Sequence, residues 1–195
     1  MENNRFKLIF VTGNLHKLDE IKKYLENVEV VGQKIDLPEL QGDPEVIAKT
    51  KAKEASRIIN GPIVIDDTCF HIEAFNGFPG PYARDHIKTI GNKITLKMLQ
   101  NFDNRKAKFV CRATYCEPSN EPIIFEGTVE GKIAAEIRGK EGFGFDPIFI
   151  PENEDKTFGE MSVEEKNKFN HRARAFKKLA DYLGQNNHNI FKQLP

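Results

Sequence analysis

The chain has 195 residues, enough for one substantial domain, and its 29 Lys and Arg residues balance its 29 Asp and Glu residues. This balance argues against a nucleic-acid partner, because proteins that bind a polyphosphate backbone carry a positive excess. The three cysteines are odd in number and form no CxxC pair, so we expect reduced thiols in a cytoplasmic protein. No apolar stretch is long enough to span a bilayer, and nothing argues for secretion.

The first half of the chain alternates predicted strands and helices. Short apolar runs predict strands, and apolar residues at helical spacing predict amphipathic helices. The predicted strands lie at 6–11, 28–31 and 62–65, and the predicted helices at 15–25 and 47–59. The last of these strands runs directly into Asp66 and Asp67.

The second half begins with the sequence NGFPGP, which cannot be regular structure because its prolines lack backbone donors. Ser162 and Glu165 have the spacing of a capping box. The predicted elements are a helix at 85–99, a hairpin of strands at 106–116 and 123–133, and helices at 162–168 and 170–184. Alternating strands and helices together with a hairpin predict an α/β fold with a mixed sheet.

Thr12 to Lys17 span the connection between the first predicted strand and the start of the first predicted helix. Free backbone N–H groups and the positive end of the helix dipole meet there, which suits a phosphate group. Gly13 allows close approach of the backbone and Lys17 adds a positive charge, although this is not a complete P-loop. Taken alone, the pattern is more typical of an ordinary tight turn.

Asp66 and Asp67 form the most informative polar pair. Partly buried acids need a positive partner, and Mg²⁺ is typically held by one or two carboxylates together with substrate phosphate. Adjacent residues of a strand point to opposite sides, so both carboxylates cannot serve one ion equally if the backbone stays extended. One acid would bind metal while its neighbour orients water. Two solvated acids at the start of a loop are the alternative.

The segment 142–147, GFGFDP, combines flexible backbone, two aromatic rings and one acid. Such residues can form a pocket that stacks on a nucleobase and hydrogen-bonds to its edge. A glycine-rich turn with core aromatics has the same composition. His171 and Arg172 begin a helix and could bind a base or a phosphate. Lys51 and Lys166, read alone, are ordinary solvated helix charges.

Seven motifs taken together resemble the inosine triphosphate pyrophosphatase family. In chain order they are VTGNxHK, IDLPELQGDP, IDDT, FNGFPGPYAR, FGFDPIF, TFGEM and NHRARAF, and they run from Phe10 to about Leu179. The resemblance implies a single domain over 1–195: an elongated mixed sheet with flanking helices, forming two lobes around a central cleft. It also implies a homodimer.

The implied activity is cleavage of non-canonical purine nucleoside triphosphates (ITP, dITP and XTP) to the monophosphate and pyrophosphate. The implied cofactor is Mg²⁺, with Mn²⁺ as a substitute, and the implied partner is a small-molecule nucleotide. We expect Asp67 and Lys17 to be catalytic, and Phe145 to stack on the base. The implied metal ligands are Glu39, Asp66 and Asp67. The implied substrate-binding residues are Thr12, Gly13, Asn14, Lys17, Lys51, Asp67, Thr68, Phe143, Gly144, Phe145, Asp146, Lys166, His171 and Arg172.

Two residues depart from the family pattern. Asn170 stands where Ser is usual, which keeps a good helix N-cap but not the hydroxyl. Arg84 replaces a common Lys, which exchanges a point donor for a planar fork. Two alternatives stay open: a Maf-like pyrophosphatase for other nucleotides and a non-catalytic nucleotide sensor. The assignment of base and metal ligand between Asp66 and Asp67 also stays open.

Overall fold

The computed structural model describes residues 6–38 and 40–190. Their contacts divide the chain into two compact units. The first unit comprises Met1–Asp67, Arg112–Glu126 and Arg172–Pro195, and the second comprises Thr68–Cys111 and Gly127–His171. None of the helices in the described residues is long and apolar enough to cross a membrane.

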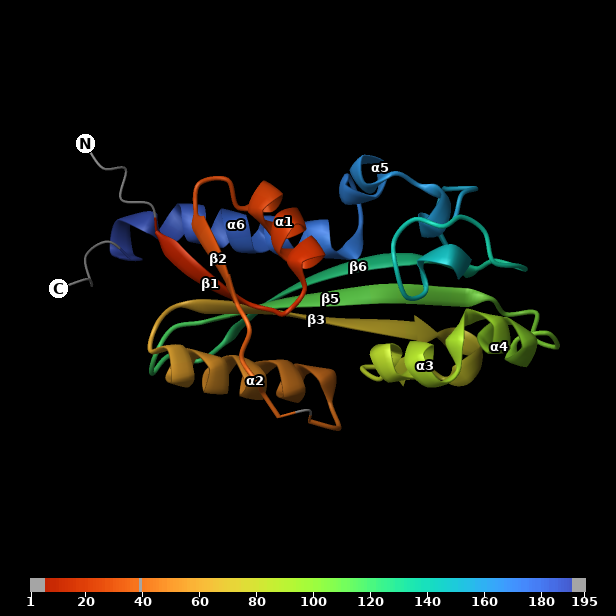
Figure 1. The fold of residues 1–195 in the computed structure, drawn as a ribbon, viewed down its shortest axis with the longest axis horizontal. Helices are drawn as coiled ribbons and strands as arrows, with labels where there is room; N and C mark the ends of the chain where they lie inside the picture. Colours follow the sequence, from red (N-terminus) through yellow and green to blue (C-terminus); the bar gives the residue numbers. More distant parts are fainter. Residues whose placement is uncertain (1–5, 39, 191–195) are drawn as a thin grey trace. The chain divides into compact units, whose positions relative to one another are not determined.

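A mixed sheet of seven strands confirms the predicted α/β class (Figure 1). The order is β2-β1-β3-β5-β6-β7, with β4 paired to β3. Strand β1 is parallel to both β2 and β3, whereas β3–β4 and β6–β7 are antiparallel. The strands are β1 (Lys7–Val11), β2 (Glu29–Gln33), β3 (Ile63–Ile72), β4 (Pro79–Gly80), β5 (Lys106–Cys116), β6 (Ile123–Ile133) and β7 (Phe149–Pro151).

In the first unit, helices cover both faces of the sheet. Helices α1 (Leu15–Tyr24) and α6 (His171–Ile190) lie on one face, and α2 (Pro44–Ile59) lies on the other (Figure 1). Ile63 and Ile65 of β3 pack with alanines of α2, while Phe10 of β1 meets Phe176 of α6 edge to face at 6.1 Å. Alternate residues of each strand therefore face different helices.

Helix α2 shows why its predicted bounds are nearly correct. Asp43 caps its first turn by accepting hydrogen bonds from the backbone N–H groups of Glu45 and Val46. Pro44 follows as the first helical residue, where its missing N–H costs nothing. Asn60 ends the helix in the left-handed conformation at φ 53°.

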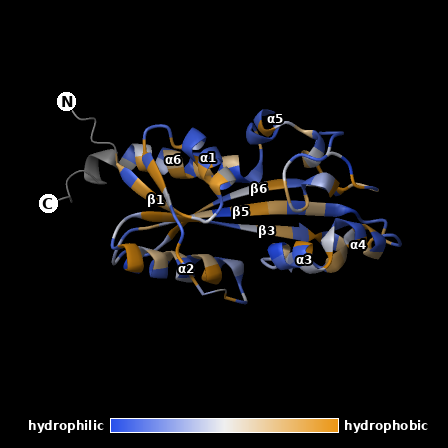
Figure 2. Ribbon diagram, viewed as in Figure 1, coloured by the Kyte–Doolittle hydropathy of each residue, from blue (hydrophilic) through white to orange (hydrophobic). Residues whose placement is uncertain are grey.

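The second unit is built around a phenylalanine-rich core. Phe70, Phe109, Phe145, Phe149 and Phe158 are all buried in it. Figure 2 shows hydrophobic residues along β5, which contributes to this core. Its helices are α3 (Ala83–Thr89), α4 (Gly91–Met98) and α5 (Val163–Asn167), with short 3-10 turns η1 (Glu73–Phe75), η2 (Asp146–Ile148) and η3 (Phe158–Glu160). The predicted capping box of Ser162 and Glu165 is present at the start of α5.

Three elements differ from their predicted bounds. The helix expected at 85–99 is two helices, because Gly91 has φ 73° and breaks the helical path. Helix α6 passes through Gly184 and continues to Ile190, since a single glycine costs a helix only about 1 kcal/mol. Strand β3 continues through Asp66 and Asp67 to Ile72 instead of ending at them.

Candidate functional site

The turn after β1 leads into the N-terminal, positive end of the α1 dipole and is ordered by side-chain caps. The Thr12 hydroxyl accepts a hydrogen bond from the Asn14 N–H at 3.0 Å, and the Asn14 side chain accepts one from the Lys17 N–H at 3.3 Å. The first turn of α1 contains no acidic residue that would compete for an anion. The geometry is therefore suitable for a phosphate group, as the sequence predicts.

The strand register brings this turn to the acidic pair. Phe10 lies opposite Val64 in the parallel β1–β3 ladder, and β1 ends at Val11. Continuing the register places the residues after Val11 alongside Asp66 and Asp67. The acids thus lie in the middle of β3 but level with the carboxyl end of β1, the edge at which ligands bind in parallel sheets.

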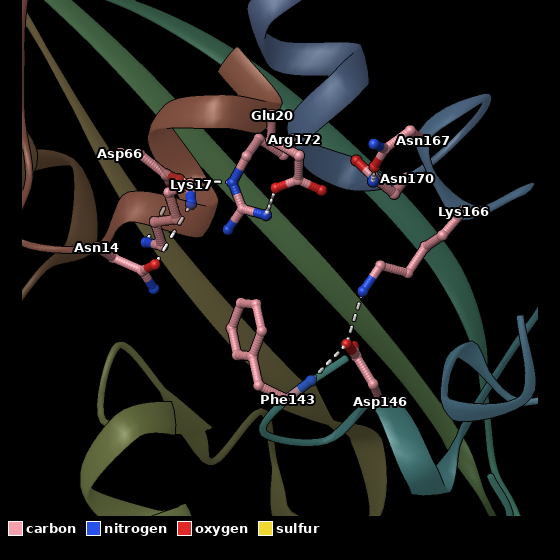
Figure 3. Close-up of polar contacts among 10 residues, drawn as sticks. All are labelled: Asn14, Lys17, Glu20, Asp66, Phe143, Asp146, Lys166, Asn167, Asn170 and Arg172. Carbon is pink, nitrogen blue, oxygen red and sulfur yellow. Dashed lines mark hydrogen bonds and ion pairs between the residues drawn. The ribbon is translucent and has the colours of Figure 1, made fainter. Parts of the chain in front are cut away.

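Asp66 lies in a buried network of charges (Figure 3). Its Oδ2 accepts a hydrogen bond from Arg172 Nε at 2.6 Å and lies 3.4 Å from Lys17 Nζ. Arg172 also donates to Glu20 Oε2 at 2.8 Å. The side chains of Asp66 and Arg172 are only 1% and 3% exposed. Two cations already compensate the Asp66 charge, so this carboxylate does not require a metal ion to be stable there.

Asp67 faces the opposite side of β3. Its Oδ1 accepts a hydrogen bond from Lys51 Nζ of α2 at 2.7 Å. Its Oδ2 is buried and has no hydrogen-bond partner in the part of the chain that the structure describes. A buried carboxylate oxygen without a partner is costly, which marks it as a position for a ligand, water or cation.

Of the three predicted metal ligands, the two that the structure describes, Asp66 and Asp67, point in opposite directions. The extended backbone directs Asp66 toward α1 and α6 and Asp67 toward α2. Glu39 lies outside the described residues, and Thr68 follows in β3 as the first residue of the second unit. Within residues 6–38 and 40–190, no group of three Asp, Glu, His or Cys side chains could hold a metal ion.

In the second unit, Asp146 and Lys166 form a buried ion pair. Lys166 Nζ donates to Asp146 Oδ2 at 2.7 Å, and the backbone N–H of Phe143 donates to the same oxygen at 3.0 Å (Figure 3). Asp146 is 4% exposed and Lys166 is 9% exposed. A Cβ atom on Gly142 would lie 2.1 Å from Asp146 Oδ2, so the close approach of this loop requires glycine.

The two aromatic residues of this loop have different environments. Phe145 is 2% exposed and stacks on Phe70 with ring centroids 4.1 Å apart, so it belongs to the core. We expected Phe145 to stack on a base, but the accessible ring is that of Phe143, which is 55% exposed. Lys166 Nζ lies 5.7 Å from the centroid of the Phe143 ring. Phe143 thus presents an aromatic face next to a charged pair.

The remaining predicted base-end residues are buried. His171 stacks on Phe109 with centroids 4.6 Å apart and an interplanar angle of 8°. The Asn170 side chain is fully buried and donates to Asn167 Oδ1 at 2.9 Å. Arg172, predicted to line the base and sugar end, pairs instead with acids of the first unit. Arg84 lies in α3.

Two residues in these clusters were not predicted from the sequence. Glu20 follows Lys17 by three positions, which places both on the same face of α1 and could have indicated its role. Asn92 donates a hydrogen bond to the carbonyl oxygen of Gly144 at 2.9 Å. No sequence pattern points to this second contact, because the two residues are 52 positions apart.

Comparison with known proteins gives a consistent result. The model of the Ham1 family matches residues 8–182. A dITP/XTP pyrophosphatase of Methanopyrus kandleri is 45% identical, with 92% of this chain and 97% of that protein covered. An inosine triphosphate pyrophosphatase of Puccinia graminis is 40% identical, with 92% and 97% covered. A solved structure of a HAM1 protein from Coxiella burnetii superimposes with a TM-score of 0.84 at 29% identity, with 92% and 99% covered.

Proposed function

The chain belongs to the Ham1 family, and on this premise we propose that it hydrolyses non-canonical purine nucleoside triphosphates to the monophosphate and pyrophosphate. ITP, dITP and XTP are the proposed substrates. The observation that carries the proposal is Asp67, whose Oδ2 is buried without a hydrogen-bond partner in the described residues while Lys51 holds Oδ1. This is the arrangement expected of a carboxylate that binds and orients a water molecule.

The first unit supplies the groups for the triphosphate. The turn formed by Thr12, Gly13 and Asn14 lies at the N-terminal end of α1, where the positive end of the helix dipole favours a phosphate group. Lys17 and Lys51 would offset the negative charge that grows on the departing pyrophosphate. Both lysines are bound to aspartates in the structure, so each is already oriented toward the acidic pair.

The residues present are suited to a magnesium ion. Carboxylate oxygens are the ligands that Mg²⁺ prefers, and the buried Oδ2 of Asp67 has no other partner in the described part of the chain. Glu39, and Asp67 through the water molecule that it orients, would hold the ion, with Mn²⁺ as a substitute. Asp66 contributes by holding Lys17 and Arg172. The ion, when bound, supplies charge neutralisation at the phosphate oxygens.

Asp67 is also the proposed proton acceptor. A water molecule attacks the α-phosphorus and gives one proton to the Asp67 carboxylate. The bond between the α-phosphorus and the oxygen that bridges to the β-phosphate breaks, and pyrophosphate leaves with the electron pair. Lys51 fixes the orientation of the carboxylate through its bond to Oδ1.

The second unit supplies the groups for the base. Phe143 provides the stacking surface, because its ring is exposed and that of Phe145 is not. Lys166 is a donor next to this ring and suits the 6-keto oxygen of hypoxanthine or xanthine. Adenine has an amino group at that position, and a buried donor facing an amine is a mismatch that can discriminate by about 10⁴-fold.

Pyrophosphate release with and without Mg²⁺ tests the proposal directly. We expect ITP, dITP and XTP to be cleaved to pyrophosphate, with ATP, GTP and UTP as comparison substrates. Orthophosphate as the first product would contradict the proposed bond cleavage, and preferential use of UTP would favour a Maf-like enzyme. Binding of ITP without turnover would indicate a nucleotide sensor. The proposed homodimer is tested separately by light scattering.

A further inference from the structure

The loop that presents Phe143 is flexible by composition. Gly142 and Gly144 flank this residue and have φ angles of 74° and 65°, in the left-handed region that glycine adopts readily. Glycine backbones have many other accessible conformations, so the loop does not determine the position of the Phe143 ring by itself. Contacts from outside the loop must select one conformation.

Two side chains from distant elements hold this loop. Lys166 acts through Asp146, whose Oδ2 accepts the Phe143 N–H. Asn92, the second residue of α4, donates from Nδ2 to the carbonyl oxygen of Gly144 at 2.9 Å. The two bonds fix the backbone on both sides of the Phe143 ring, one at its own N–H and the other at the carbonyl of the next residue.

A buried chain of hydrogen bonds lies at the start of α4, next to Asn92 in the sequence. The Thr95 hydroxyl donates to the Gly91 carbonyl at 2.8 Å and lies 2.7 Å from His86 Nε2. Because the Thr95 proton is used toward Gly91, His86 Nε2 must be the donor in the second bond. His86 and Thr95 are 2% and 0% exposed, so this chain is shielded from water. It stabilises the first turn of α4, the turn from which the Asn92 side chain donates to the Gly144 carbonyl.

We infer that Asn92 is a positioning residue for base recognition, which holds the Phe143 ring in its stacking position through the Gly144 carbonyl. The inference rests on the proposed function, since it assigns Phe143 as the stacking surface. Asn92 lies outside the segment 142–147 and contributes by restricting the loop. Lys166 restricts the same loop through its ion pair with Asp146, which binds the Phe143 N–H. Asn92 restricts it through a neutral hydrogen bond to the Gly144 carbonyl.

The expected effect is on substrate affinity. Stacking is made in the bound substrate and in the transition state alike, so loosening the ring raises KM and leaves kcat unchanged. The loss of one neutral hydrogen bond corresponds to a change of roughly 3- to 10-fold. We therefore expect KM for ITP to rise by about this factor in Asn92→Ala.

Four single variants, Phe143→Ala among them, and one double variant test the inference. Asn92→Ala removes the donor, and Asn92→Asp keeps the side-chain volume but places an acceptor against the Gly144 carbonyl. Lys93→Ala, an exposed neighbour in α4, is the matched control. Each variant is measured for KM and kcat with ITP, for binding of IMP by calorimetry and for thermal unfolding. The double variant Asn92→Ala with Phe143→Ala shows whether Asn92 acts through the ring.

Support would consist of weaker ITP and IMP interaction in both Asn92 variants, an unchanged Lys93→Ala, and no further loss when Asn92→Ala is added to Phe143→Ala. An unchanged KM, a fall confined to kcat, or additive losses in the double variant would overturn the inference. If the wild-type protein released no pyrophosphate from ITP, the proposed function would fail. IMP binding would still decide whether Asn92 supports the base end.

Discussion

The two buried carboxylates Asp66 and Asp146 are both paired with cations, but their supports differ. Asp66 lies on the regular strand β3, and its partners Lys17 and Arg172 come from helices α1 and α6. Asp146 follows a glycine loop, and its partner Lys166 comes from the five-residue helix α5. The Asp66 cluster is thus positioned by secondary structure, whereas the Asp146 cluster depends on individual side-chain contacts.

This difference suggests a division between chemistry and selectivity. A catalytic carboxylate must keep its geometry with every substrate, and rigid elements provide this. A base-reading loop can change its preference when a few contacts change, as loops on rigid scaffolds generally do. Substitutions of Asp66, Asp67 and their partners should therefore affect turnover or stability, and those of exposed residues in the segment 142–147 should affect which nucleotide binds.

The largest expected effect is that of Asp67→Asn. Loss of the proton acceptor should lower kcat for ITP by roughly 10³-fold, because general-base catalysis contributes about 10² to 10⁴. Nucleotide binding should be retained, since Lys17, Lys51 and the turn after β1 remain. Asp181→Asn, at an exposed position of α6, is the control and should be fully active. Full activity of Asp67→Asn would remove this residue from the base role.

The next prediction distinguishes the roles of the two phenylalanine rings in the segment 142–147. Phe145→Ala should lower the free energy of unfolding by about 3 to 5 kcal/mol, as expected for a buried phenylalanine. Phe143→Ala should leave stability almost unchanged and raise KM for ITP instead. Denaturant unfolding and steady-state kinetics of both variants measure the contrast. Equal destabilisation by the two substitutions would contradict the assigned environments.

Arg172→Met should reduce the free energy of unfolding by about 3 kcal/mol, because it leaves Asp66 and Glu20 with less compensation in a buried setting. Arg57→Met is the matched control: Arg57 also pairs with a glutamate, but its side chain is 73% exposed. The control should leave stability almost unchanged, because exposed ion pairs contribute little. Urea unfolding curves provide the comparison.

The smallest expected effect is a pH dependence from His86 in the second unit. Burial lowers the pKa of His86 below its usual value of 6.5, so the unfolded chain binds a proton more readily than the folded protein. Stability is therefore full above pH 6.5 and falls as the pH decreases below it. In His86→Gln, the decrease in melting temperature between pH 7 and pH 5 should be smaller. An identical decrease would exclude a contribution from His86.

The sequence predicts the parts of the fold that depend on local signals. Helix α2 is flanked by Asp43, Pro44 and Asn60, which begin and end helices through their own backbone chemistry. The full length of β3 was not predicted, because Asp66 and Asp67 resemble a strand end. Their charges are compensated by residues distant in the chain, Arg172 106 positions from Asp66 and Lys51 16 positions from Asp67. Such partners cannot be seen in a local pattern.

The candidate site was predicted in composition more than in arrangement. The turn between β1 and α1 and the loop before η2 lie where the sequence predicts them. Whether Phe143 or Phe145 is accessible depends on the left-handed glycines around Phe143, and side-chain type alone does not determine it. Asn92 could not be identified, because its contact is to a backbone carbonyl that any residue could provide.

The opposite orientations of Asp66 and Asp67 restrict how this gene can change in length. Deleting a single codon just upstream of the pair would rotate each carboxylate to the other side of the strand, exchanging the partners of both acids at once. Deleting a codon from the segment between β5 and β6 has no such consequence, because the residues of a turn do not alternate between the two faces of a sheet. Natural length variation should accordingly be absent from the middle of β3 and concentrated in the β5–β6 connection.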